Sequence, residues 1–178
     1  MASIQTLSDA DRRTVARWAA ACAERVVSLF VADDEAVEQV QDALARTIAY
    51  ARGESTADAE IAKRMIAVKA AGRATTPAGA AAARSVAQAS AVAHMGAHAL
   101  GAAAYAAKAV SIAEPDRVDD EVHWQLDQLT ADEQVALRRL PLLGDDSAGP
   151  LGPGLLSRGV LGTVIEQIQS SVGDPHRI

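Results

Sequence analysis

The sequence predicts an all-α fold, in which a single alanine-rich bundle of about seven helices precedes a C-terminal helix. Apolar residues recur at steps of three and four along most of the chain, which is the period of a helix with one buried face. Hydrophobic residues make up 49% of the chain but aromatic residues only 3%, so alanine supplies much of the apolar volume. No segment alternates polar and apolar residues as a strand does.

A length of 178 residues suits one domain with a sizeable core. We expect a helical bundle over residues 1–140 and a Gly/Pro-rich linker over residues 141–154. An amphipathic helix with a tail is expected over residues 155–178, although Gly159 and Gly162 weaken this helix by roughly 1 kcal/mol each relative to alanine.

Two helices are expected at the N-terminal end. Ser8 is a helix N-cap, and two aspartates in the turn after it favour the positive end of the helix dipole. This helix should stop near Ala32, and its apolar stripe consists of Val15, Trp18, Cys22, Val26 and Leu29. A second helix starts at residues 33–34 and ends before Gly53, which suits the position after a C-cap.

Three further helices are expected in the middle of the chain. Ser55 or Thr56 caps the first of them, which carries on one face Ile61, Met65, Val68 and Gly72. The next runs from about Pro77 to His94, because proline suits the first turn of a helix. A break at residues 95–96 then separates this helix from the next one, which reaches about Ala113.

The last part of the bundle contains two short helices. Residues 117–129 form one, and Thr130 with Glu133 forms a capping box that opens another through about Leu140. After the linker, the final helix has an apolar stripe of Leu155, Leu156, Val160, Val164, Ile165 and Ile168. We favour packing of this helix on its own core, although exchange of residues 155–170 between copies would give a homo-oligomer.

Composition and charge exclude several classes of function. The net charge is −6 and the cations are scattered along the chain, which argues against nucleic-acid binding. Cys22 is the single cysteine, so no disulfide framework is expected. The N-terminus has no secretory signal, and charged residues such as Arg84 and Lys108 interrupt the alanine-rich run at a cost too high for a membrane span. We expect a cytoplasmic protein.

His94 and His98 are four residues apart, a spacing that can begin a metal site on a continuous helix. A zinc-protease motif has a glutamate after the first histidine, and this chain has Met95 there. If the chain turns at Gly96, the histidines flank a helix junction and hydrogen-bond loose backbone groups instead. We favour that structural role and expect neither a metal nor a cofactor.

Tyr105 and Lys108 follow on the next helix and could face the same way as His98. Together with the two histidines they form the best candidate polar cluster. The alternative is that Tyr105 is a packing residue and Lys108 is a surface charge whose stem covers apolar surface.

The densest acidic segment of the chain consists of Asp116, Asp119, Asp120 and Glu121. Its negative charge could steer a basic protein partner toward the chain. The remaining carboxylate pairs fall at helix starts or in the linker, where capping explains them. The glycine-rich stretch lacks the lysine and hydroxyl residue of a phosphate-binding loop. No catalytic set is apparent, and we expect a protein that is not an enzyme.

The run AHMGAHALGAAAYAAKAV over residues 93–110 resembles the signature segment of actinobacterial immunity proteins from bacterial polymorphic toxin systems. The likeness also includes LSDADRRTVARWAAACAER (residues 7–25), YARGE (residues 50–54) and LRRLP (residues 137–141). The whole resemblance spans about residues 7 to 141. The chain departs from that family at residues 66–71, where relatives carry a histidine, and at Gly96, where they carry a proline. Some relatives are labelled exonuclease subunits, but this chain lacks the carboxylates and nucleotide loop of such an enzyme.

The resemblance implies a non-catalytic cytoplasmic protein that binds and neutralises a toxin through a helical surface. Two alternatives remain open. The first is a small-molecule or metal-binding protein that uses the cluster of His94, His98, Tyr105 and Lys108. The second is a self-assembling structural component in which the C-terminal helix exchanges between copies.

Overall fold

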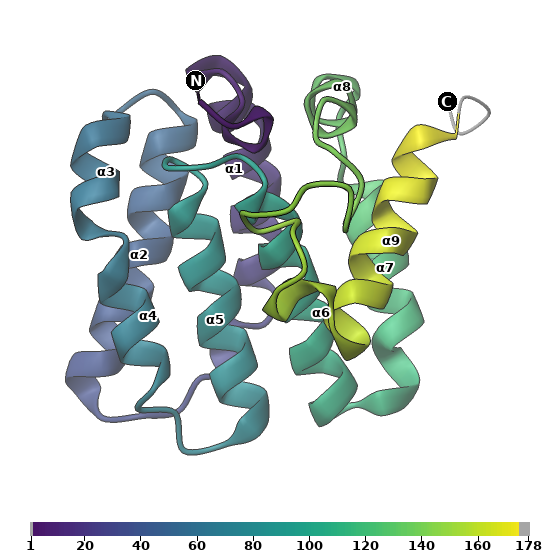
Figure 1. Ribbon diagram of the computed structural model, residues 1–178. Coiled ribbons are helices and arrows are strands. Elements are labelled where there is room, and N and C mark those ends of the chain that lie inside the picture. Colours follow the sequence, from purple (N-terminus) through teal and green to yellow (C-terminus); the bar gives the residue numbers. More distant parts are fainter. Residues whose placement is uncertain (1, 175–178) are drawn as a thin grey trace.

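The computed structural model describes residues 2–174, and no strand occurs among them (Figure 1). The predicted all-α fold is therefore confirmed. The end of the predicted C-terminal segment, residues 175–178, lies outside the described residues. Within the described part of the chain, no helix is long and apolar enough to cross a membrane.

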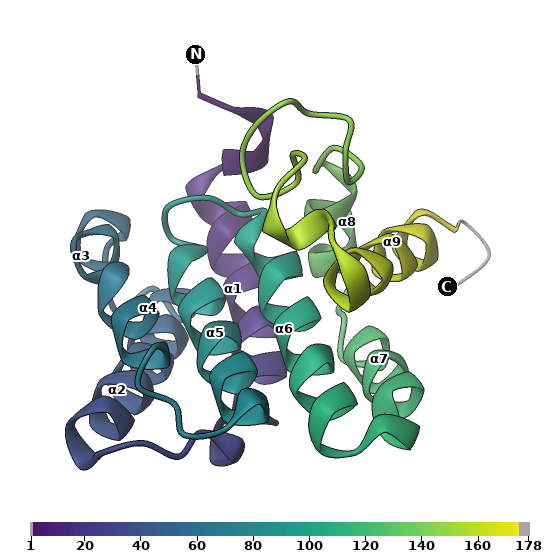
Figure 2. The same cartoon turned by 60° about the horizontal axis from the view of Figure 1, so that its bottom comes forward.

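Three helices form the centre of the bundle: α1 (Asp9–Glu24), α5 (Pro77–Ala91) and α6 (His98–Ala113). Figure 2 shows α1 behind α5 and α6. The contact between α5 and α6 is the most extensive in the fold. Buried alanines occupy much of it, because a side chain of one methyl group lets two helix axes approach closely. The Ser85 hydroxyl donates a hydrogen bond across this contact to the carbonyl of Ala102 at 2.7 Å.

Other helices cover the two sides of this centre (Figure 1). On one side lie α2 (Asp34–Ala51), α3 (Ala57–Lys63) and α4 (Met65–Ala71). On the other side lie α7 (Val118–Asp127), α8 (Ala131–Arg138) and α9 (Gly159–Gly173). The last of these, α9, packs on α6, α8 and α7 of its own chain and buries apolar residues such as Ile165 and Ile168.

The helix starts that capping residues predicted are confirmed. Ser8, Asp33 and Thr56 each accept a hydrogen bond from a backbone N–H three residues later. Thr130 and Glu133 form both hydrogen bonds of the predicted capping box. These side chains satisfy N–H groups that a helix start would otherwise leave without partners.

The first helix ends at Glu24, so the prediction that it would continue to about Ala32 is wrong. A short 3-10 helix, η2 (Val27–Leu29), follows it and packs on α5. Consecutive β-branched residues, Val26 and Val27, disfavour a continued α-helix. The helix predicted from Pro77 to His94 ends earlier, at Ala91.

The third predicted helix is two helices, because the chain bends at Arg64 between α3 and α4. Its apolar face is directed outward, with Met65 49% and Val68 46% exposed. The face that packs on α5 is made of alanines, including Ala67 and Ala70. Only small side chains fit where α4 lies close to α5, and the larger apolar residues therefore face solvent.

The Gly/Pro-rich segment over residues 141–154 is irregular, and the side chain of Gln5 holds it in place. The Gln5 amide nitrogen donates to Asp146 Oδ2 at 2.8 Å and to the carbonyl of Ala148 at 2.7 Å. Its amide oxygen accepts from the backbone N–H of Leu151 at 3.0 Å. Figure 2 shows this loop beside the N-terminal segment.

The backbone around Gln5 also contacts the junction between α5 and α6. The carbonyl groups of Gln5 and Thr6 accept hydrogen bonds from Ala97 and Gly96, each at 3.0 Å. A Cβ atom at Gly96 would lie 2.5 Å from Cδ1 of Leu7, so a larger residue there would require the Leu7 side chain to move. We call this set of contacts around Gln5 the N-terminal clasp.

Candidate functional site

The junction between α5 and α6 places His94 and His98 on one groove of about 350 Å³. Apolar residues supply much of its remaining lining, through Met95, Pro150, Leu155 and Leu156. The Nδ1 atom of His98 lies 2.7 Å from the amide oxygen of Gln88. Because an amide oxygen only accepts, His98 Nδ1 must carry the proton, and Nε2 is left as an acceptor.

Burial lowers the pKa of His98 to about 4, and the nearby His94 contributes to the shift. His98 is therefore neutral at pH 7, while His94 is exposed to solvent. Neither imidazole forms the predicted hydrogen bond with a loose backbone group; His98 bonds to the side chain of Gln88. Among residues 2–174, no three histidine, cysteine or acidic side chains gather as metal ligands.

Tyr105 and Lys108 lie further along α6. Lys108 Nζ is 5.9 Å from the centre of the Tyr105 ring, and burial raises the pKa of Tyr105 against the opposing charge of Arg84. These residues are seven and ten positions after His98, or about 10 and 15 Å along the helix axis. The predicted cluster is thus divided: the histidines share a groove, and Tyr105 and Lys108 form a separate pair.

The predicted acidic segment is also divided. Asp116, Asp119 and Asp120 are exposed. Glu121 is buried and forms an ion pair with Arg25 at 2.9 Å. The surface charge of this segment is therefore smaller than the sequence indicated, because one of its four carboxylates faces the interior.

A larger groove, of about 670 Å³, lies between α1, α2 and α8. We call it the α1–α8 groove. From α1 it contains a strip at helical spacing that includes Thr14, Arg17, Ala21 and Glu24. From α2 and α8 it contains Ile48, Ala51, Arg52, Thr130, Asp132 and Glu133. Its lining combines small or apolar side chains with charged ones, of which Glu133 is buried and the others at least partly exposed.

The Arg17 side chain is fixed at the edge of this groove. Its Nε and Nη2 atoms donate to the two carboxylate oxygens of Glu133 at 2.5 and 2.6 Å, and Nη2 also donates to the carbonyl of Gln128 at 2.9 Å. The hydrogen bond to Glu133 raises the pKa of Arg17. Two parallel hydrogen bonds to a carboxylate define the position of a guanidinium more strictly than a single contact does.

Arg13 is held in a similar way. Its guanidinium lies 4.4 Å from the centre of the Tyr50 ring and donates to the carbonyls of Tyr50 and Ser55 at 2.7 and 3.0 Å. It also donates to Asp9 at 2.8 Å, which lowers the pKa of that carboxyl. The groove therefore has a fixed shape on the α1 side.

Three charged side chains on the groove are exposed and form no ion pair within the described chain, namely Arg52, Glu24 and Asp132. They are available to a partner. Sequence reasoning did not identify this groove, because its residues come from three helices that are far apart along the chain. The sequence signals that fall on this surface are the motif LSDADRRTVARWAAACAER, which contains Arg13 and Arg17, and the capping box of Thr130 and Glu133.

The fold and its surfaces define a class of protein: an all-α bundle with a preformed, charged groove of a size that suits contact with another molecule. A family model described as "Imm-5 like putative immunity protein" matches residues 5–132, and the chain belongs to this family. The match covers α1 to α7 and the start of α8, and so includes most of the α1–α8 groove. No curated protein and no solved structure matches the chain.

Proposed function

We propose that this chain is an immunity protein that binds and neutralises a toxin of a polymorphic toxin system in the cytoplasm of the cell that makes it. The observation that carries the proposal is the family match over residues 5–132. The resemblance of residues 93–110 to the signature segment of such proteins supports the same function. The role requires binding alone, with no reaction catalysed by this chain.

The α1–α8 groove supports a way in which the toxin is bound. The α1 strip from Thr14 to Glu24 extends for about 15 Å, which is the length of roughly three turns of a partner helix. Because Arg13 and Arg17 are already held by Asp9 and Glu133, little side-chain freedom is lost when a partner binds. Arg52, Glu24 and Asp132 can then pair with charges on the toxin segment.

Co-expression tests this function. A candidate toxin, recovered from the source cells by pulldown with the tagged full chain, is expressed in a bacterial host with and without that chain, and survival and complex formation are measured. We expect the chain to restore growth and to form a complex with the toxin. Absence of both protection and a complex would contradict the proposed function.

A second pair of variants tests the groove itself. Ala21→Trp fills the groove, and Ala45→Trp places the same side chain on an exposed part of α2 outside it. We expect Ala21→Trp to abolish protection and Ala45→Trp to retain it. If both variants protect equally, another surface binds the toxin, and the immunity function itself stands.

One observation favours a second candidate function, the binding of a small molecule or metal ion at the groove of His94 and His98. The Nε2 atom of His98 is an acceptor that no described residue engages, beside an apolar lining that suits a small ligand. Metal content and ligand-induced thermal shifts of the purified chain test this idea. Unchanged metal content, ligand binding and partner binding in a His94→Ala, His98→Ala double variant would exclude it.

A further inference from the structure

Arg84 and Tyr105 lie opposite each other where α5 and α6 pack side by side. The two helices are antiparallel, and the Gln88 amide of α5 occupies the place that a Cβ atom of Gly101 on α6 would fill. Arg84 is one turn before Gln88, and Tyr105 is one turn after Gly101. The same register that brings Gln88 to Gly101 therefore brings Arg84 to Tyr105.

Tyr105 carries a hydroxyl group without a hydrogen-bond partner. The residue is only 3% exposed, and no described residue bonds to its hydroxyl. The hydroxyl oxygen is not fully enclosed, so the small exposed part of Tyr105 includes it. Buried tyrosines usually hydrogen-bond through the hydroxyl. This donor is thus held in a fixed place by the packed ring and is available to a ligand.

Two cations flank the Tyr105 hydroxyl. Lys108 is one turn further along α6, and its Nζ atom lies 5.9 Å from the centre of the Tyr105 ring. Burial raises the pKa of Tyr105, and the positive charge of Arg84 partly offsets that rise, as expected from its position across the helix pair. Arg84 and Lys108 form no ion pair with any residue among 2–174. We call Arg84, Tyr105 and Lys108 the α5–α6 strip.

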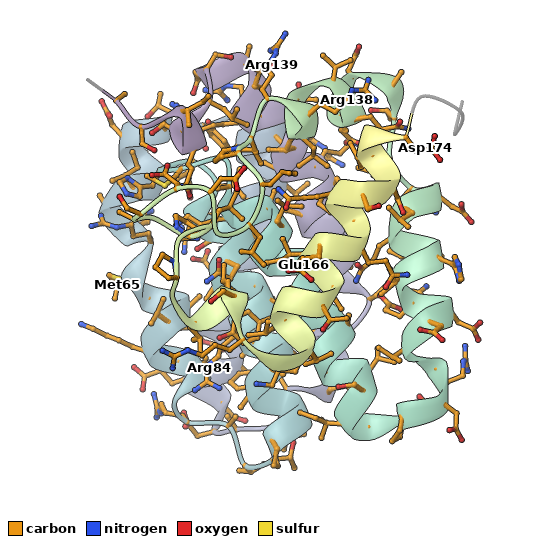
Figure 3. All side chains as sticks on the ribbon, turned by 45° about the vertical axis from the view of Figure 1, so that its right-hand side comes forward. Met65, Arg84, Arg138, Arg139, Glu166 and Asp174 are labelled. Atoms are coloured by element: carbon orange, nitrogen blue, oxygen red, sulfur yellow. The ribbon has the colours of Figure 1, made fainter. Side chains whose placement is uncertain are left out.

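The helices that carry the α5–α6 strip have no acidic residue. Residues 61–113 include all of α4, α5 and α6 and contain no Asp or Glu, although the chain has 23 such residues. Figure 3 shows Arg84 on the near side of the molecule, apart from Glu166 on α9, the helix that packs on α6. The charges of Arg84 and Lys108 are therefore not neutralised by carboxylates of their own helices.

We propose that the α5–α6 strip binds a phosphate group, either as the free ion or as the ester of a small molecule. A guanidinium can donate two parallel hydrogen bonds to phosphate oxygens, and the lysine ammonium and the tyrosine hydroxyl each donate to a further oxygen. Two cations match a group that carries up to two negative charges and has at least three acceptor oxygens. A carboxylate has one charge and two oxygens, and it matches this set of donors less well.

The α5–α6 strip shares no residue with the α1–α8 groove or with the groove of His94 and His98. The proposal therefore does not depend on toxin neutralisation. Gln88, one turn after Arg84, lines the groove of the two histidines. The rest of a bound phosphate ester can extend from the strip toward the apolar lining of that groove.

The test uses the full chain labelled with ¹⁵N, whose backbone amide signals in α5 and α6 are followed by NMR. Inorganic phosphate replaces chloride at constant ionic strength, so that general screening of charge stays the same. We expect shifts around Arg84, Tyr105 and Lys108 that saturate with a Kd of about 1 mM or below. Tighter binding of phenyl phosphate would identify an ester as the ligand, and equal binding would identify the free ion. Shifts that rise without saturation would overturn the proposal.

Variants locate the bound phosphate. Arg84→Ala changes an exposed residue and should weaken phosphate binding by about tenfold or more, and Tyr105→Phe, which keeps the ring, should weaken it by about threefold or more. Lys63→Ala removes an exposed lysine of the same acid-free segment from α3 and should bind phosphate like the unmodified chain. Circular dichroism checks that each variant folds. Unchanged binding by Arg84→Ala, or an equal loss in Lys63→Ala, would refute the assignment of the site.

Discussion

Arg17 and Glu133 are 116 residues apart in the sequence, and two parallel hydrogen bonds between them join α1 to α8. Glu133 is 1% exposed and also accepts the backbone N–H of Thr130 at 2.8 Å, which closes the capping box at the start of α8. One buried carboxylate thus fixes the start of a helix and positions a guanidinium at the edge of the α1–α8 groove. Local and long-range structure depend on the same side chain.

Replacing Glu133 should destabilise the fold. Glu133→Ala removes both the ion pair and the cap, and we expect a loss of about 2–4 kcal/mol in the free energy of unfolding. Glu133→Gln retains an acceptor for the backbone N–H of Thr130, so its free energy of unfolding should fall by less. Denaturant titration measures both, with the exposed Glu24→Ala on α1 as a control that should change stability by less than about 0.5 kcal/mol. Equal effects of Glu133→Ala and Glu24→Ala would contradict this expectation.

Stability should depend on pH through His98. Its pKa is about 4 in the folded chain against an ordinary value of 6.5, so the unfolded state binds the proton more readily. Above pH 6.5, His98 is neutral in both states and does not lower the free energy of unfolding. As the pH falls from 6.5 toward 4, protonation of His98 in the unfolded state lowers the free energy of unfolding. Between pH 6.5 and pH 5 the loss should be about 1.5 kcal/mol, measured by denaturant titration at each pH.

The control for this pH dependence is a comparison of two histidine variants. His98→Gln cannot titrate and should lose less stability over the same pH range. His123→Gln replaces an exposed histidine on α7 and should behave like the unmodified chain. The same pH dependence in His98→Gln and the unmodified chain would show that another group is responsible.

The N-terminal clasp should be sensitive to Gln5. Gln5→Ala removes three hydrogen bonds from the loop over residues 144–152, and we expect a loss of about 2 kcal/mol and faster hydrogen exchange in that loop. Gln5→Glu should be worse, because its carboxylate would face Asp146 and the carbonyl of Ala148 with no proton to donate. Gln41→Ala, at an exposed position of α2, is the control. Unchanged exchange in Gln5→Ala would contradict the proposed importance of these bonds.

Close packing between η2 and α5 should make Gly79 difficult to replace. A Cβ atom there would lie 2.7 Å from the carbonyl oxygen of Leu29 and 3.3 Å from the Cα of Phe30, which are backbone atoms that cannot rotate away. Gly79→Ala should therefore lower the melting temperature and cost about 1–3 kcal/mol, although alanine favours helix more than glycine does. Gly173→Ala, where no atom lies within 4 Å of the added group, should have a small effect. A stabilised Gly79→Ala variant would refute this expectation.

Sequence patterns predicted the helices well where the cause is local. Ser8, Asp33 and Thr130 bond to N–H groups three residues later, and the residues that make each contact are visible in one short window. The break before His98 was predicted from Met95 and Gly96, which is also a local signal, although no side chain caps the start of α6. Periodicity also placed Met65 and Val68 on one face of a helix.

Periodicity could not show which neighbour each face would meet. The α4 face with Met65 is exposed because α5 approaches closely enough to accept only alanines, and that spacing belongs to the assembled bundle. The inward direction of Glu121 depends on Arg25, which lies just after α1 and is distant in the sequence. The α1–α8 groove and the contacts of Gln5 likewise require residues more than a hundred positions apart to meet, and no local pattern encodes such a meeting.

The N-terminal clasp has a consequence for synthesis of the chain. Gln5 is translated before the loop that it holds, because Asp146 follows it by 141 residues. Helices α1 to α6 can begin to pack during translation, whereas the hydrogen bonds of the Gln5 side chain must wait until residues 146–151 have been made. A product that ends before residue 146 would leave the Gln5 amide without these partners, so burial of this side chain shows that translation has passed the loop.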